Sequence, residues 1–394
     1  MPLFTSEYVF SDDYPTIEPS LKLDFANARA LDPRITFTRA STATYVGANG
    51  LIKTAGADEA RFDHDPSTGE SLGLLIEESR TNILPYSEDF SQSAWVTFGT
   101  ASKSSNVATA PDGNFTADSI TIPAASGVLD NILISVNTTY TFSAYIRGTP
   151  GTTIRILSNA NSSGIVTNIV TVSEIWQRYS VTFTTNSGDN NTSIQFDSGG
   201  GNTFYVWGAQ VEAGSFPTSY IPTNGPTSGS TVTRAVDNAF ITGQNFSSWY
   251  NQSEGTVRIL AKTNRVYSGS NAFPYSMQID DGTANNRFAV DNGVLSSTIR
   301  QKLSVWENGS AVGGNLGNLQ NVNGLSCAFA YKINDLAFVN GAGTLFTNDN
   351  TPIPTTMNRL QIGSGTGGIL TGYIAQLTYY PKRLTNAQLQ TLTQ

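Results

Sequence analysis

A chain of 394 residues is longer than one ordinary hydrophobic core organises, so two or three domains are expected. Hydrophobic residues make up 39% and charged residues 13%, and the abundance of Gly, Ser, Thr and Asn favours short strands and polar turns over helices. The net charge of −8, with scattered Lys and Arg, argues against nucleic-acid binding. One Cys and one His exclude an intrachain disulfide, a thiolate cluster and a two-His metal site. Neither a signal peptide nor a run of ~20 apolar residues is recognisable, so no membrane insertion is expected.

Residues 1–30 are predicted to form an extended N-terminal arm, because acidic residues and prolines interrupt any core-forming pattern. Alternation in LKLDF (residues 21–25) predicts one strand there. The arm is either a frayed terminus or an anchor that orders on a neighbouring subunit. We interpret it as a particle anchor, since the rings of Tyr8, Phe10 and Tyr14 are costly to leave in water.

Residues 31–96 are predicted to be a hairpin-rich connector. An Asn-Gly turn at residues 49–50 separates two short alternating stretches, which is typical of a β-hairpin. The region is dense in charge for this chain, and ion pairs would fix its geometry if they were partly buried. The residues concerned are Arg34, Arg39, Arg61, Glu77, Glu78 and Arg80. Glu77 and Glu78 are adjacent and therefore point to opposite faces of a strand, so we interpret them as structural and not as a glycosidase pair.

Residues 97–223 are predicted to form a jelly-roll β-sandwich. Strands with period-two alternation, such as YTFSAYI (residues 140–146), are separated by Gly, Asn and Ser turns. Trp176 and Trp207 lie in alternating strand text and are predicted to be core residues. A Gly/Ser/Pro-rich linker follows at residues 224–233.

Residues 234–394 are predicted to form a second β-sandwich that ends in a short helix. Thr385 and Gln388 have the spacing of a capping box at the start of this helix. The predicted fold class is thus all-β and multi-domain.

Three passages resemble known families. RFDHDPSTGESLGLLIEESRTNILPYSEDFSQSAW (residues 61–95) resembles a passage of virion structural and tail fibre proteins of tailed bacteriophages, especially marine ones. FYVWGAQVEAGSFPTSYIPT (residues 204–223) is similar to the last strand of carbohydrate-binding jelly rolls. NDLAFVNG (residues 334–341), with the strands at residues 360–363 and 372–380, resembles concanavalin A-like (laminin G-like) sandwiches.

The resemblance implies a location in the virion, where other phage proteins are partners. It also implies a homo-oligomer, for which a trimer is the leading expectation, and contact with host surface glycans. It brings no catalytic residue, and we expect a non-enzymatic protein. Two alternatives stay open: a capsid or tail decoration protein whose sandwiches make only protein–protein contacts, and a glycan depolymerase.

Candidate ligand residues lie in turn-rich text. Trp249, Tyr250 and Trp306, and also Trp95, are predicted to stack on sugar rings, although an interface role suits all four equally. Asp280-Asp281-Gly282 either supplies oxygen ligands for Ca²⁺ or forms a hairpin turn, and we favour the turn.

His64, between Asp63 and Asp65, either belongs to an acid–base or metal cluster or lies in a hydrated turn ahead of Pro66. We interpret it as a hydrated turn.

Overall fold

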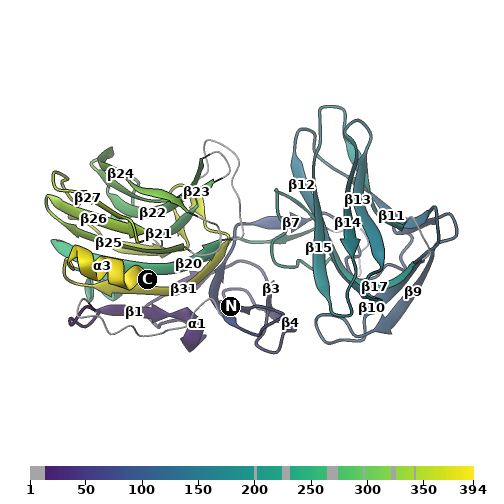
Figure 1. Ribbon diagram of the computed structural model, residues 1–394, viewed down its shortest axis with the longest axis horizontal. Coiled ribbons are helices and arrows are strands. Elements are labelled where there is room, and N and C mark those ends of the chain that lie inside the picture. Colours follow the sequence, from purple (N-terminus) through teal and green to yellow (C-terminus); the bar gives the residue numbers. More distant parts are fainter. Residues whose placement is uncertain are drawn as a thin grey trace.

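The computed structural model describes residues 14–198, 202–223, 231–263, 274–295, 298–320, 325–340 and 343–394. The predicted linker core (residues 224–230) and the anchor residues Tyr8 and Phe10 lie outside these ranges. The described chain is nearly all β and forms two lobes, each a sandwich of two sheets (Figure 1), so the predicted fold class is confirmed. None of the described helices is long and apolar enough to cross a membrane.

The jelly-roll lobe consists of two antiparallel sheets. The first, here called the aromatic sheet, is ordered β15 (Gln177–Thr184), β12 (Thr139–Gly148), β17 (Asn202–Ala213), β10 (Ala117–Ile122) and β9 (Ser102–Ala108). The second is ordered β14 (Gly164–Thr171), β13 (Thr153–Ala160), β16 (Asn191–Ser198), β11 (Ser126–Leu133) and β8 (Val96–Phe98). Between them lies one hydrophobic core, in which the predicted inward face of residues 140–146 is buried.

The concanavalin A-like lobe consists of two larger sheets. One is ordered β27 (Leu345–Asn348), β26 (Asp335–Asn340), β25 (Leu325–Lys332), β20 (Glu254–Thr263), β31 (Gly372–Tyr380), β6 (Ser71–Ile76) and β5 (Phe62–His64), with β1 (Leu21–Asp24) also paired to β31. The other is ordered β2 (Thr36–Thr38), β19 (Asn238–Thr242), β28 (Arg359–Ile362), β21 (Tyr275–Asp280), β22 (Arg287–Leu295), β23 (Thr298–Glu307) and β24 (Ser310–Gln320), with β29 (Ser364–Gly365) and β30 (Gly368–Ile369) beside β21.

The jelly roll is an insertion into the concanavalin A-like lobe. Strands β2 and β6 precede the jelly roll in the chain yet pair with β19 and β31, which follow it, and β5 extends the second of these sheets by pairing with β6. The chain leaves and re-enters the lobe side by side, because β7 (Arg80–Asn82) pairs with β18 (Val232–Arg234). The two ends of the chain therefore build one sandwich together. The pairing of β6 with β31 requires a glycine at position 73. The φ angle of Gly73 is +95°, and a Cβ atom there would lie 2.3 Å from the carbonyl oxygen of Ile374 on β31.

The predicted arm and connector are therefore not separate modules. The strand expected at residues 21–25 exists as β1, but Leu21 and Leu23 are buried in the core of the concanavalin A-like lobe. Tyr14, the described member of the predicted anchor, is 44% exposed. The predicted Asn-Gly hairpin is confirmed as β3 (Ala43–Val46) and β4 (Ile52–Ala55), which lies between the two lobes (Figure 1).

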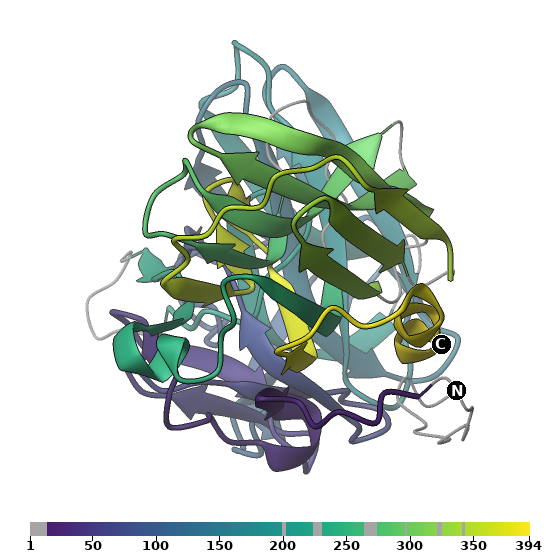
Figure 2. The ribbon, with the colours of Figure 1, turned by 90° about the vertical axis from the view of Figure 1, so that its left-hand side faces the viewer.

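Three short helices complete the described chain: α1 (Phe25–Ala28), α2 (Gly243–Ser247) and α3 (Asn386–Thr393). The predicted capping box is confirmed at α3, where Thr385 accepts from the backbone of Gln388 and the Gln388 side chain accepts from the backbone of Thr385. Leu389 of α3 packs on the outer face of β25 and β26. Figure 2 shows this helix and the N-terminal strand at the side of the same lobe.

Candidate functional site

The aromatic residues predicted to contact sugar in the concanavalin A-like lobe are mostly core residues. Trp249 and Tyr250 follow α2 and are only 4% and 8% exposed. Their rings lie 4.9 and 5.4 Å from the ring of Tyr379, so neither offers a free face to a ligand. The prediction that they bind sugar is wrong. The turn-rich sequence does not show that α2 and the residues after it pack on the core. Trp95, at 1% exposure, is likewise a core residue of the jelly roll.

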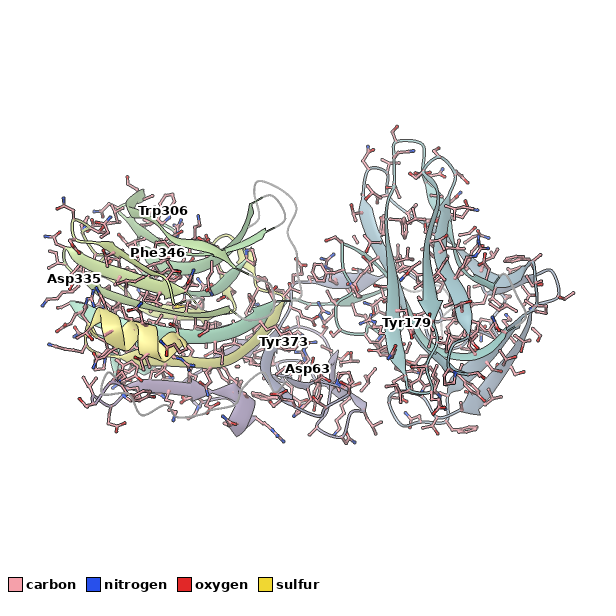
Figure 3. The ribbon with its side chains drawn as sticks, viewed as in Figure 1. Asp63, Tyr179, Trp306, Asp335, Phe346 and Tyr373 are labelled. Atoms are coloured by element: carbon pink, nitrogen blue, oxygen red, sulfur yellow. The ribbon has the colours of Figure 1, made fainter. Side chains whose placement is uncertain are left out.

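Trp306 is half-buried on β23, and the guanidinium carbon of Arg287 lies 4.1 Å from its ring centroid. One face of this ring is thus occupied by a cation–π contact. Figure 3 shows Trp306 in the concanavalin A-like lobe, away from the junction between the lobes.

The acidic loop forms a turn, as the favoured interpretation expects. Asp280 is buried and paired with Arg359 at 2.8 Å. Asp281 accepts from the backbone and hydroxyl of Thr283 and from Asn286, so its oxygens order the turn itself. Across the described ranges, no group of three or more His, Cys, Asp and Glu side chains is placed to hold a metal ion.

The single His and the single Cys are both buried. His64 ends β5 with 4% exposure, and its Nδ1 lies 3.1 Å from the carbonyl oxygen of Val46, so the predicted hydrated turn is wrong. Pairing of β5 with β6 carries His64 into the lobe, which the local sequence does not indicate. Burial raises the pKa of the Cys327 thiol, which leaves it unreactive.

A buried ion cluster joins the lobes. It contains Arg39, Arg61 and Glu77 from the connector and Arg234 and Asp237 from the returning chain, and all five side chains are at most 4% exposed. Arg61 donates to Glu77 at 2.8 Å and to Asp237 at 2.5 Å, and Arg234 lies 3.0 Å from Glu77. We call this group the junction ion cluster.

The jelly roll is tied to this cluster through the exit segment after β17. The backbone N–H and the hydroxyl of Ser219 donate to Glu77 at 2.8 and 2.6 Å. Burial alone would raise the pKa of Glu77, but Arg234 and Arg61 outweigh burial and hold it at about 2. The prediction that Glu77 is structural is consistent with this geometry. Arg234 and Asp237 were missed, although they are the only charged residues between 231 and 253.

The outward face of the aromatic sheet carries exposed rings. Arg147 of β12 lies between the rings of Trp176 and Tyr205, with its guanidinium carbon 5.0 and 5.2 Å from their centroids. All three side chains are half-buried, and Trp176 donates to the carbonyl of Thr109 at 3.0 Å. We call Arg147, Trp176 and Tyr205 the aromatic platform. Trp176 is therefore not the core residue predicted, because it precedes β15 on the side away from the core.

The other end of the same face is covered. Trp207 is buried, as predicted, but beneath Tyr220, whose ring lies 4.6 Å away, and beside Ile52 of the β3–β4 hairpin. Next to this contact a half-enclosed cavity of about 160 Å³ opens between the lobes. Its walls include Tyr145 and Arg178 from the aromatic sheet and Asp63 and Tyr373 from the concanavalin A-like lobe. Figure 3 shows the last two close together at the junction.

Asp63 is the carboxyl of this cavity. Its Oδ1 accepts from the backbone of Val46 at 2.5 Å and its Oδ2 from the hydroxyl of Tyr373 at 3.0 Å. Burial raises the pKa of Asp63 to about 6, against the opposing effect of the hydrogen bonds from Val46 and Tyr373. The carboxyl is thus ionised above pH 6 and neutral well below it.

In a comparison with protein families, residues 84–208 match a carbohydrate-binding domain. The jelly-roll lobe is therefore a β-sandwich of the carbohydrate-binding class. No curated protein matches the chain.

Several solved structures are similar in part. The CBM40 of Ruminococcus gnavus IT-sialidase, bound to α2,3-sialyllactose, is 15% identical and has a TM-score of 0.30, and the match covers 38% of this chain and 88% of that one. The CBM22 tandem of Paenibacillus barcinonensis Xyn10C is 8% identical with a TM-score of 0.28, covering 77% and 98%. Tailspike protein 4 of bacteriophage CBA120 is 12% identical with a TM-score of 0.28, covering 34% and 21%. These superpositions are too loose to support a statement about function.

Proposed function

We propose that this chain is a non-catalytic, glycan-binding structural protein, carried on the particle of a tailed bacteriophage as a fibre or appendage subunit. The observation that carries the glycan-binding part is the aromatic platform, three half-buried side chains on a sandwich of the carbohydrate-binding class. Flat rings stack on the apolar face of a pyranose, and a fixed guanidinium between them donates to hydroxyl groups. The virion location is supported by the sequence resemblance of residues 61–95 alone.

The test of glycan binding is an array of bacterial surface glycans, probed with the wild-type chain and with Trp176→Ala. Trp306→Ala is a matched control, since each tryptophan is half-buried and covered on one face by an arginine. Loss of one stacking ring is expected to weaken binding about tenfold or more in Trp176→Ala and to leave Trp306→Ala unchanged. Loss in Trp306→Ala alone would move the site to the concanavalin A-like lobe, and no bound glycan would refute the function.

The virion location is tested by mass spectrometry of purified particles, in which a fibre subunit must be present at a fixed stoichiometry. Fibres gain avidity from linked sites, so we propose a homo-oligomer, with a trimer as the leading expectation. Light scattering of the purified chain measures its mass directly. Reducing-sugar release from the bound glycan tests the non-catalytic part, and measurable cleavage would refute it.

A decoration or assembly role is the second candidate, and one surface favours it. Ile165 and Ile169 lie on β14, the edge strand of the second jelly-roll sheet, and are 64% and 68% exposed. Exposed aliphatic side chains on a free sheet edge suit a protein–protein contact. An Ile165→Lys, Ile169→Lys variant tests this role in two measurements. A purely assembly role predicts that the variant is not incorporated into particles and that neither it nor the wild-type chain binds glycans, whereas the glycan-binding role predicts that both purified chains bind glycans equally.

A further inference from the structure

The cavity between the lobes has the dimensions and chemistry of a ligand site. Its volume of about 160 Å³ is comparable to engineered protein cavities of about 150 Å³ that hold one benzene ring. Unlike those, this cavity has polar and charged side chains in its walls. The cavity therefore holds one six-membered ring. Because the cavity is open on one side, the exocyclic groups of a pyranose would project through the opening.

The walls combine aromatic faces with hydrogen-bonding groups. Tyr45, Tyr145 and Tyr373 contribute rings, Asp63 contributes a carboxyl group, and Arg178 contributes a guanidinium. Stacking faces with a few convergent polar groups are what sugar rings need, because a pyranose has both apolar C–H faces and a rim of hydroxyls. A purely apolar ligand would leave the polar groups unpaired.

The polar groups keep hydrogen-bonding capacity in this structure. Each oxygen of Asp63 accepts one described hydrogen bond and can accept another. The Nε of Arg178 is buried and has no hydrogen-bond partner in the described part of the chain, although its other nitrogens bond Thr218 and Ser143. Glu77 also lines the cavity, but Arg61, Arg234 and Ser219 already occupy its oxygens.

The charges of the walls are close to balanced. Arg61 and Arg234 pair with Glu77, and above pH 6 the ionised Asp63 shares the cavity with Arg178. A sugar acid or phosphate would gain from Arg178 but would also approach the Asp63 carboxylate in a poorly solvated space, so an uncharged ligand is favoured. Vicinal hydroxyls of a neutral sugar can instead donate to Asp63 while a third oxygen accepts from Arg178.

We propose that the junction cavity binds one neutral pyranose ring, the terminal residue of a glycan whose neighbouring residues lie on the aromatic platform. The proposal rests on the glycan-binding function, and it adds residues from the second lobe to that site. Tyr145 in the cavity and Arg147 in the platform are two residues apart on β12 and share its outward face, about 7 Å apart. A glycan that spans both would contact both lobes.

The experiment uses the full chain and the methyl glycosides of glucose, galactose, mannose and N-acetylglucosamine as probes. Saturation-transfer NMR detects binding, and calorimetry gives the Kd. At least one methyl glycoside is expected to bind the wild-type chain. Asp63→Asn removes a charged acceptor and is expected to weaken binding about tenfold or more, and Tyr373→Phe, which keeps its ring, is expected to weaken it a few-fold. Trp306→Ala is the control that leaves binding unchanged.

The outcomes separate this proposal from the function on which it rests. If the glycan array is blank, the glycan-binding function fails. If oligosaccharides bind through the platform but no methyl glycoside binds, the cavity assignment is overturned and the function stands. The same holds if Asp63→Asn and Tyr373→Phe bind a methyl glycoside as tightly as the wild type. Tyr373→Phe, which loses one oxygen only, keeps the test decisive if Asp63→Asn does not fold.

Discussion

Replacing Glu77 by Gln tests whether the junction ion cluster holds the two lobes together. The substitution keeps the shape of the side chain but removes the charge that faces Arg61 at 2.8 Å and Arg234 at 3.0 Å. Both guanidiniums are fully buried and keep their own charge. Breaking a buried pair in this way typically costs 3–5 kcal/mol, because an uncompensated charge stays in a poorly solvated site.

The low pKa of Glu77 indicates that the ionised form of this side chain is stabilised by an energy of similar size. The arginines lower it from 4.5 to about 2, against the opposing effect of burial, and a shift of roughly 2.5 units corresponds to about 3 kcal/mol. Because the folded-state pKa is depressed, this stabilisation is complete above pH 4.5 and is lost as the pH falls toward 2. The difference between wild type and Glu77→Gln is therefore expected to be largest at neutral pH.

Urea denaturation followed by tryptophan fluorescence, at several pH values, measures this difference. Glu78→Gln is the matched control, since it is the same chemical change one residue away at a pair that is partly exposed, 12% and 24% for Arg80 and Glu78. Such a pair contributes about 0–1 kcal/mol. If Glu77→Gln costs no more than Glu78→Gln at pH 7, the buried cluster does not stabilise the junction and the reasoning fails.

The pKa of Asp63 is raised from 3.8 to about 6, so its ionisation makes the folded state less stable as the pH rises through that window. The free energy of unfolding of Asp63→Asn, relative to wild type, is therefore expected to rise by up to about 3 kcal/mol between pH 4 and pH 7.5, whatever the lost hydrogen bond costs at both pH values; the same difference at both pH values would contradict this. Trp249→Ala is expected to cost about 3–5 kcal/mol, as for other buried aromatic residues, whereas an exposed ligand contact would cost almost nothing in urea denaturation. Deleting residues 1–30 removes β1 and should lower the melting temperature of the concanavalin A-like lobe, since Leu21 and Leu23 are buried in its core. Thr385→Ala is expected to cost about 1 kcal/mol through the lost helix cap, with the half-buried Thr391→Ala as a control in the same helix.

Local pattern was sufficient for the secondary structure of this chain. Alternation in LKLDF predicted β1, the Asn-Gly turn predicted the β3–β4 hairpin, and Thr385 with Gln388 predicted the capping box. Each of these features is formed by residues within a few positions of one another, so it can be predicted from the local sequence. The all-β class follows in the same way from strand and turn composition.

The nesting of one sandwich inside the other depended on tertiary structure. Pairing of β6 with β31 joins residues almost 300 positions apart, and nothing local marks which strand completes a sheet. For the same reason Trp249 and Tyr250 were mistaken for exposed rings: the turn-rich sequence around them does not indicate that they pack in the core of the lobe. His64 was mistaken for a hydrated residue on similar grounds.

The candidate site was likewise predictable from the sequence only in part. Tyr145 and Tyr205 could be placed on strands from the alternation of apolar and polar residues. The resemblance of residues 204–223 to carbohydrate-binding jelly rolls could also be recognised, because these residues are consecutive in the sequence. The cavity could not be found in this way, because Asp63 and Tyr373 meet only when β5, β6 and β31 join in one sheet, and Arg178 reaches them only when the inserted jelly roll closes against that sheet. Strand pattern reports which face of a strand is apolar, whereas the contact between two lobes is set by long-range pairing and by buried charges that find their partners only in the folded chain.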